Sequence, residues 1–186
     1  MDEKTVKVSK KPRTIDMIYV GLSAALIALG AWIAIPVGDI PITLQTLMIC
    51  LVSGLFGMKR GTLSVLIYII LGAVGVPVFS NFKAGLGVLA GPTGGYIVGF
   101  VFTSLIVGFV SDKMKGRLWV VAIAMVVGIA VCYMFGTAWF YVYMQSKKAV
   151  TLSYILGLCV VPYIVPDVVK TALACVLVSR LKKFVK

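Results

Sequence analysis

Apolar residues occur along this chain in six long stretches that are separated by short polar or glycine-rich segments. The stretches run approximately over residues 17–37, 42–58, 62–77, 93–111, 118–143 and 151–179. A transmembrane helix needs about 20 apolar residues to cross a hydrocarbon core of about 30 Å. Each stretch is near that length, although the second and third are short. The pattern therefore predicts an all-α membrane protein with six transmembrane helices.

The composition agrees with this pattern and narrows the class of protein. The 186 residues are 61% hydrophobic and 13% charged, with a mean hydropathy of +1.08, which excludes an ordinary soluble globular protein. At this length we expect a single domain over residues 1–186, in which residues 1–16 form a basic N-terminal segment. The chain has no histidine, and its four cysteines are scattered singly in apolar stretches, so we expect neither a metal site nor a cofactor.

The lysine and arginine residues predict the orientation of the chain in the membrane. With a cytoplasmic N-terminus, 14 of the 18 would lie in inside segments, three in outside loops and one within a span. Cytoplasmic segments of membrane proteins carry an excess of these residues, so both termini are predicted to be cytoplasmic. The same distribution accounts for the net charge of +12, and we expect no nucleic-acid partner.

Two charged residues, Asp167 and Lys170, lie inside the last apolar stretch. Residues three apart share one face of a helix. A charge near the bilayer centre costs roughly 2.5–3.5 kcal/mol, so such residues usually pair, face a cavity and mark a substrate or ion path. The alternative is a pair that only neutralises itself and holds helices together. Pro162 and Pro166 precede the pair and predict a kinked helix with a pocket that opens to the outside.

The connection over residues 75–96 is too apolar for a solvated loop and too rich in glycine and proline for a continuous helix. Irregular backbone at membrane depth occurs where it is buried in protein or lines a cavity. This connection offers hydrogen-bond donors, aromatic faces and unobstructed backbone amides at a helix N-terminus, which favours anions. The candidates are Asn81, Lys83, Phe79, Tyr96, Gly94 and Gly95. The alternative is a plug that closes the outer end, with glycines that serve only tight packing.

A second polar stretch, residues 39–45, leads into the second span. Its Thr43 and Gln45 are candidate ligand contacts. The alternative for both is a hydrogen bond between helices, worth roughly 0.6–2 kcal/mol within a membrane.

Three segments of the chain together resemble the BioY family. They are Gly75-Val-Pro-Val-Phe79 leading to Gly91-Pro-Thr-Gly-Gly-Tyr96, the upstream Pro41-Ile-Thr-Leu-Gln-Thr46, and Asp167-Val-Val-Lys170. BioY proteins are the substrate-binding (S) components of energy-coupling-factor (ECF) biotin transporters. The resemblance implies a compact bundle of six helices, with biotin held near the outer surface beneath the first and third outside loops. It places the protein in the cell membrane with its pocket facing the exterior.

Biotin fits the chemistry of the candidate residues. Its ureido ring presents two N–H donors and one carbonyl, which a buried carboxylate such as Asp167 and an amide such as Asn81 or Gln45 would complement. Its carboxylate needs a cation or helix N-terminal amides, available at Lys83, Lys170 or Gly94–Gly95. Its apolar bicycle would pack against aromatic rings, for which the candidates are Phe79, Tyr96 and Trp32. The sequence leaves open which cation binds the biotin carboxylate and which neutralises Asp167.

Uptake against a gradient would need a partner, because the chain lacks a Gly-x-x-x-x-Gly-Lys-Ser/Thr loop for ATP. In the first span, Ala24 and Ala28 are four residues apart, and Gly21 and Ala25 form a parallel pair. Such small residues let another helix approach closely, although packing within the chain would produce the same pattern. The resemblance implies docking through this helix on a transmembrane coupling (T) protein, which is carried by two ATPase subunits. It also implies that the whole S component topples to carry its pocket inward.

Three other functions remain to be distinguished. An S component for another vitamin, such as riboflavin or thiamine, would share the fold. A membrane-embedded enzyme finds no support, since histidine and clustered carboxylates are absent from the sequence. A purely structural membrane subunit would use Asp167 and Lys170 as a clasp between helices.

Overall fold

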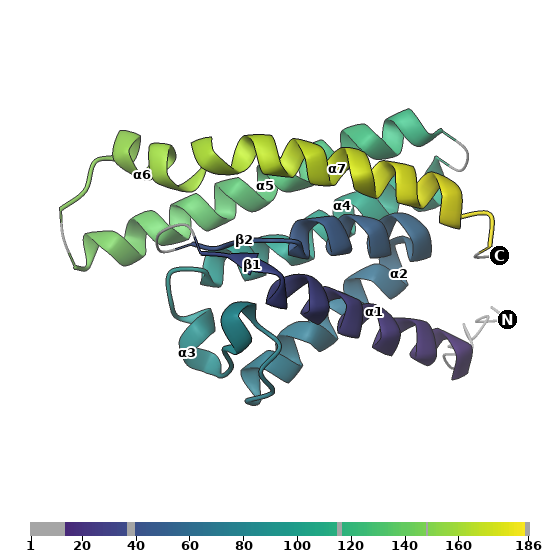
Figure 1. The fold of residues 1–186 in the computed structure, drawn as a ribbon, viewed down its shortest axis with the longest axis horizontal. Coiled ribbons are helices and arrows are strands. Elements are labelled where there is room, and N and C mark those ends of the chain that lie inside the picture. Colours follow the sequence, from purple (N-terminus) through teal and green to yellow (C-terminus); the bar gives the residue numbers. More distant parts are fainter. Residues whose placement is uncertain (1–13, 37–39, 115–116, 148, 185–186) are drawn as a thin grey trace, which may run out of the picture.

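The computed structural model describes residues 14–36, 40–114, 117–147 and 149–184, and it is mostly helical (Figure 1). The helices are α1 (Thr14–Trp32), α2 (Gln45–Ala73), α3 (Leu86–Leu89), α4 (Gly94–Lys113), α5 (Leu118–Gln145), α6 (Leu152–Cys159) and α7 (Val161–Leu181). A short 3-10 helix, η1 (Ser80–Phe82), and two strands, β1 (Ala34–Ile35) and β2 (Ile42–Thr43), complete the described elements. Most of the predicted basic segment at 1–16 lies outside the described residues.

Within the described residues, five helical segments are long and apolar enough to cross a membrane. They are Thr14–Trp32, Gln45–Ala73, Gly94–Lys113, Leu118–Gln145 and Leu152–Leu181. The second of these is not one straight helix, because Gly57 has non-helical dihedral angles (φ 76°, ψ −173°). Figure 1 shows α2 running away from the strands and then folding back on itself. The second and third predicted spans are thus the two arms of α2, and each of the six predicted spans has a helical counterpart.

The bend in α2 depends on a glycine and a carboxylate. A positive φ of 76° favours glycine, because a Cβ clashes with the backbone in this region. A Cβ on Gly57 would also meet the carboxylate of Asp112, with Oδ2 only 2.8 Å away. That same Oδ2 accepts a hydrogen bond of 2.9 Å from the backbone N–H of Met58, which starts the second arm. The carboxylate therefore satisfies a donor that the bend leaves without a helical partner.

The structure differs from the prediction between the first and second spans. Instead of a helix to residue 37, α1 ends at Trp32, and β1 and β2 form an antiparallel ribbon that pairs Ala34 with Thr43 and Ile35 with Ile42. Pro36 and Pro41 lie between the two strands and disfavour helix there, while the β-branched residues of the strands, Ile35, Ile42 and Thr43, favour extended backbone. The backbone N–H of Leu44 then donates to the carbonyl of Gly30 at 3.0 Å, which ties the ribbon to the end of α1.

The last predicted span is also interrupted. The chain breaks at Val160 (φ −121°, ψ −54°), which separates α6 from α7. Pro162 lies in the first turn of α7, where its missing N–H costs no helical hydrogen bond, and Pro166 lies inside the helix. The predicted irregularity is therefore present, but as a break before the prolines.

The two ends of the bundle differ in character. Figure 1 shows the start of α1 and the end of α7 at one end of the molecule. The ribbon, α3 and the connection between α5 and α6 gather towards the opposite end. The described chain ends therefore lie at the end of the bundle opposite the ribbon and α3.

Candidate substrate-binding site

A cavity lies at the ribbon end of the bundle, between the start of α2, the connection that precedes α4, and helices α4, α5 and α7. It encloses about 640 Å³, the solvent at its open side included. Small-molecule pockets are mostly apolar with a few placed polar groups. The lining fits that description and consists of Ile40, Pro41, Thr43, Gln45, Thr46, Tyr68, Phe79, Ser80, Val88, Thr93, Tyr96, Ile97, Phe100, Cys132, Tyr133, Tyr163, Asp167 and Lys170.

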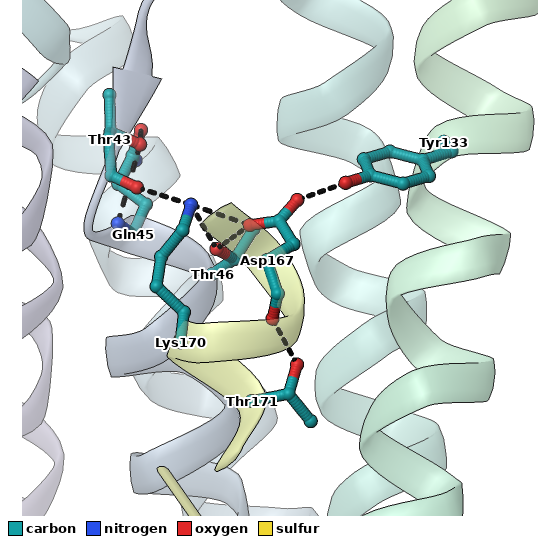
Figure 2. A network of polar contacts seen from close by, with 7 residues as sticks. All are labelled: Thr43, Gln45, Thr46, Tyr133, Asp167, Lys170 and Thr171. Atoms are coloured by element: carbon teal, nitrogen blue, oxygen red, sulfur yellow. Dashed lines mark hydrogen bonds and ion pairs between the residues drawn. The ribbon is translucent and has the colours of Figure 1, made fainter. Parts of the chain in front are cut away.

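The buried ion pair of Asp167 and Lys170 borders this cavity. The two residues are 5% and 7% exposed, and Lys170 Nζ lies 2.5 Å from Asp167 Oδ1. Both lie on the first half of α7 at spacing i, i+3, where their side chains emerge on the same face. Figure 2 shows the pair between the start of α2 on one side and α5 on the other.

Neighbouring hydroxyl and carbonyl groups complete a network around the pair (Figure 2). Lys170 Nζ donates to the backbone carbonyl of Thr43 at 2.9 Å and to Thr46 Oγ1 at 3.2 Å. Thr46 Oγ1 in turn donates to Asp167 Oδ1 at 2.9 Å. The hydroxyl of Tyr133, from α5, donates to Asp167 Oδ2. The network thus joins α7 to both α2 and α5.

A count of donors and acceptors shows what the network leaves for a ligand. An ammonium has three N–H donors, and those of Lys170 are directed to Asp167, Thr43 and Thr46. A carboxylate has about four acceptor sites, and in the described part of the chain Asp167 uses three, for Lys170, Thr46 and Tyr133. The pair is therefore neutralised internally, yet it keeps an acceptor site on Asp167 and the lone pairs of Tyr133 at the cavity.

Thr43 and Gln45 line the cavity, but they also bond to their neighbours. Thr43 Oγ1 donates to Gln45 Oε1 at 3.3 Å, and Gln45 Nε2 donates to the hydroxyl of Tyr68 at 2.7 Å. Tyr68 lies on the second arm of α2, so this bond also holds the two arms together. For these two residues the structure contains both arrangements that the sequence left open, a place at the cavity and a hydrogen bond between helices.

The two aromatic candidates of the connection before α4 lie at the cavity. Phe79 is buried, lines the cavity and packs edge-on against Tyr68, with ring centroids 5.5 Å apart. Tyr96 is buried at the start of α4 and also lines it. The connection itself is irregular as predicted, with η1 and the four-residue α3 as its helical parts.

The two polar candidates of the same connection require a correction. Asn81 and Lys83 are exposed, and neither is among the residues that line the cavity. Asn81 and the following Phe82 both have a φ of 57°, so the chain makes a left-handed turn here. Asparagine tolerates this conformation better than most residues.

Phe82 stacks on Trp32 with ring centroids 5.0 Å apart, and the indole N–H of Trp32 donates to the carbonyl of Pro77. Trp32 thus supports the connection from outside the cavity.

Gly94 and Gly95 are buried and do not line the cavity. A Cβ on Gly95 would lie 2.6 Å from the carbonyl oxygen of Phe135 in α5, and one on Gly94 would collide with the backbone carbonyl of Leu89 at the end of α3. The missing side chains thus allow α4 to pack closely against α5 and α3, which is the tight packing that the sequence left open. The predicted anion site at these amides is not at the cavity; Thr93, one residue earlier, does line it.

Several lining residues were not identified from the sequence, above all three tyrosines. Tyr68, Tyr133 and Tyr163 come from α2, α5 and α7, and the hydroxyl of Tyr163 donates to the carbonyl of Ile40 beside the ribbon. Each is an aromatic residue in an apolar helix, a pattern shared with tyrosines that face lipid, such as the exposed Tyr154. The segments that carry the resemblance contain three further lining residues, Pro41, Thr46 and Thr93.

The small residues of α1 divide between the interior and the surface. Ala24 and Ala28 are 4% and 6% exposed and belong to the hydrophobic core, whereas Gly21 and Ala25 are exposed. The first pair therefore corresponds to packing within the chain, which corrects the expectation that it forms a docking face. The second pair remains available to a partner, and a Cβ on Gly21 would meet no atom within 4 Å.

Comparisons with known proteins agree with this architecture. The family model described as the BioY family matches residues 2–186. The chain belongs to the BioY family. The "Biotin transporter BioY" of Thermotoga maritima is 39% identical over 169 residues, covering 90% of this chain and 96% of the relative. The "Probable biotin transporter BioY" of Pyrococcus horikoshii is 40% identical over 167 residues, with the same coverage of 90% and 96%.

A solved structure shares the fold. The crystal structure of "the S-component for biotin from an ECF-type ABC transporter" superposes with a TM-score of 0.83 at 29% sequence identity, covering 95% of each chain.

Proposed function

We propose that this chain binds biotin in the cavity beside Asp167 and serves as the substrate-specificity subunit of an ECF-type biotin transporter. Its relatives are named biotin transporters, and its structural neighbour is an S component for biotin. The observation that carries the proposal is the Asp167–Lys170 pair at the cavity wall, neutralised within the protein but with an acceptor site to spare. A neutral ligand group that donates hydrogen bonds, such as the ureido N–H, suits this wall better than a second charge.

The orientation of bound biotin follows from the donors and acceptors that the hydrogen-bond network leaves free. The ureido ring would lie at Asp167 and Tyr133, and the apolar bicycle would lie against Phe79 and Tyr96. The biotin carboxylate would then be directed towards the open side, because the donors of Lys170 are already engaged. Half-buried Ser80 and Thr93 offer hydroxyl groups there.

Membrane orientation and partners complete the proposal. The positive-inside rule places both termini in the cytoplasm, and the cavity end of the bundle lies opposite the described chain ends. Biotin would therefore enter from the exterior. A T protein and two ABC ATPase subunits would supply the energy, and the whole subunit would topple in the membrane to release biotin inside.

Equilibrium binding to the detergent-solubilised chain tests the proposed substrate. We expect biotin to bind with a measurable heat in titration calorimetry. Riboflavin, which has a larger planar ring system, and thiamine, which carries a positive charge, should give no heat at the same concentration. Tight binding of either of these vitamins in place of biotin would refute the proposal.

The exposed face of α1 is the proposed docking surface, and its role can be separated from folding. Gly21→Leu and Ala25→Leu should abolish uptake of labelled biotin by cells that contain the partners, because a bulky side chain prevents the close approach of a helix. Biotin binding by the purified variants should be unchanged. The matched control is Leu22→Ala on the exposed surface of the same helix, which should retain uptake. If the two variants lost binding together with uptake, this face would serve folding and not docking.

A further inference from the structure

The hydroxyl group of Tyr68 is a buried donor that faces the cavity. Tyr68 is 1% exposed and lines the cavity from the second arm of α2. Its oxygen accepts the hydrogen bond of 2.7 Å from Gln45 Nε2, so its own proton is not used in that bond. In the part of the chain that the structure describes, no acceptor for this proton is present. Buried hydroxyl groups rarely leave a donor unused, which indicates that a ligand atom accepts it.

The position of this hydroxyl is set by its neighbours. Gln45 Oε1 accepts from Thr43 Oγ1 at 3.3 Å, which turns the amide so that Nε2 points at Tyr68. The ring of Tyr68 is held edge-on by Phe79. The hydroxyl group is thus held by the hydrogen bond between the two arms of α2, and the ring is held by its packing against Phe79.

Tyr68 and Asp167 both line the cavity, and each is held by a residue at the start of α2. Gln45 contacts Tyr68, and Thr46 contacts Asp167. The wall of one cavity therefore presents both a donor and an acceptor. A cyclic urea presents the complementary pair, a carbonyl beside an N–H.

We propose that Tyr68, positioned by Gln45, donates its hydroxyl proton to the carbonyl oxygen of the ligand's urea and so determines specificity for a urea over its imine analogue. The inference rests on the proposed function and adds to it the group that recognises the urea carbonyl of the ligand. A site with a buried donor discriminates strongly against a ligand that lacks the matching acceptor, because the donor then stays unpaired.

Three ligands and one conservative variant test the assignment. Biotin carries the urea carbonyl, and biotinamide keeps the urea but neutralises the carboxylate. In 2-iminobiotin a guanidine replaces the urea, and at neutral pH this group is protonated, so it carries N–H donors and no acceptor for the tyrosine proton. In calorimetric titrations, Tyr68→Phe should bind biotin and biotinamide about tenfold more weakly than the wild type does, since one hydrogen bond is lost. The affinity for 2-iminobiotin should be unchanged. The matched control is Tyr154→Phe, at a tyrosine that is 60% exposed, which should bind all three ligands as the wild type does.

The remaining outcomes separate this inference from the proposed function. An equal loss for all three ligands would assign the hydroxyl a structural role and overturn the inference, as would unchanged biotin affinity. If Tyr68→Phe weakened the binding of biotin but not of biotinamide, the hydroxyl would contact the biotin carboxylate, and this would also overturn the inference. If the wild type failed to bind biotin, the proposed function would fall as well. Gln45→Met provides a second variant should Tyr68→Phe fold poorly, and it should show the same ligand dependence with a smaller loss.

Discussion

Replacing Asp167 with asparagine is expected to weaken biotin binding by about 100-fold, the largest effect on affinity that the site predicts. The substitution replaces one carboxylate oxygen of Asp167 with an NH₂ group, which can place an N–H donor against the ureido N–H. It also leaves the ammonium of Lys170 without its counter-ion in a buried environment. Calorimetric titration of biotin into the solubilised variant measures the loss.

The control for this prediction is Asp112→Asn at the opposite end of the bundle. Asp112 accepts from the backbone N–H of Met58, and the side-chain carbonyl of asparagine can still accept that bond. The control should therefore fold and bind biotin as the wild type does. Equal biotin affinity in Asp167→Asn and the wild type would remove Asp167 from the site.

Replacing Lys170 with methionine is expected to produce the largest loss of stability. Breaking one half of a buried ion pair leaves an uncompensated charge, which typically costs about 3–5 kcal/mol in the free energy of unfolding. Methionine has a similar volume, so the cost arises from the carboxylate of Asp167, which loses its counter-ion. Thermal unfolding followed by size-exclusion chromatography in detergent measures the change.

A double-mutant cycle separates the charge effect from other effects at this position. Asp167→Asn combined with Lys170→Met removes both charges, and the double variant should lose less stability than the sum of the two single variants. Biotin binding should remain weak in the double variant, since the carboxylate of Asp167 is still replaced by an amide. Lys147→Met, at an exposed lysine, should leave stability nearly unchanged. If the two single effects simply added, the pair would not be energetically coupled. A cycle that affected stability but not binding would favour the structural subunit.

The sequence predicts the site well where a residue is unusual for its surroundings. Asp167 and Lys170 stand out because charges are costly in an apolar helix, and the structure brings them to one cavity with Thr43, Gln45, Phe79 and Tyr96. The tyrosines of the site could not be identified in this way. A tyrosine in an apolar helix is compatible with lipid, core or cavity, and only the packing of α2, α5 and α7 decides between them.

Predictions that depended on local backbone direction were less successful. The side-chain amide of Asn81 and the backbone amides of Gly94 and Gly95 made these residues candidate ligand contacts. In an irregular connection, however, the direction of each group depends on the backbone dihedral angles. The left-handed turn at Asn81 and Phe82 directs both residues outward. In α1, small residues at i, i+4 occur on two faces, and only the packing shows that Ala24 and Ala28 face the core. Likewise, the polar residues 59–61 predict a break between two spans, but the bend lies at Gly57, and its stabilisation by Asp112 is a contact between distant parts of the chain.

A crystal structure of the chain with biotin bound tests the central claim most directly. The account predicts a ureido nitrogen within about 3.2 Å of Asp167 or Tyr133, with the ion pair to Lys170 intact and the biotin carboxylate directed towards Ser80 and Thr93. Biotin bound with its carboxylate on Lys170, or held at any place away from the Asp167 wall, would contradict it.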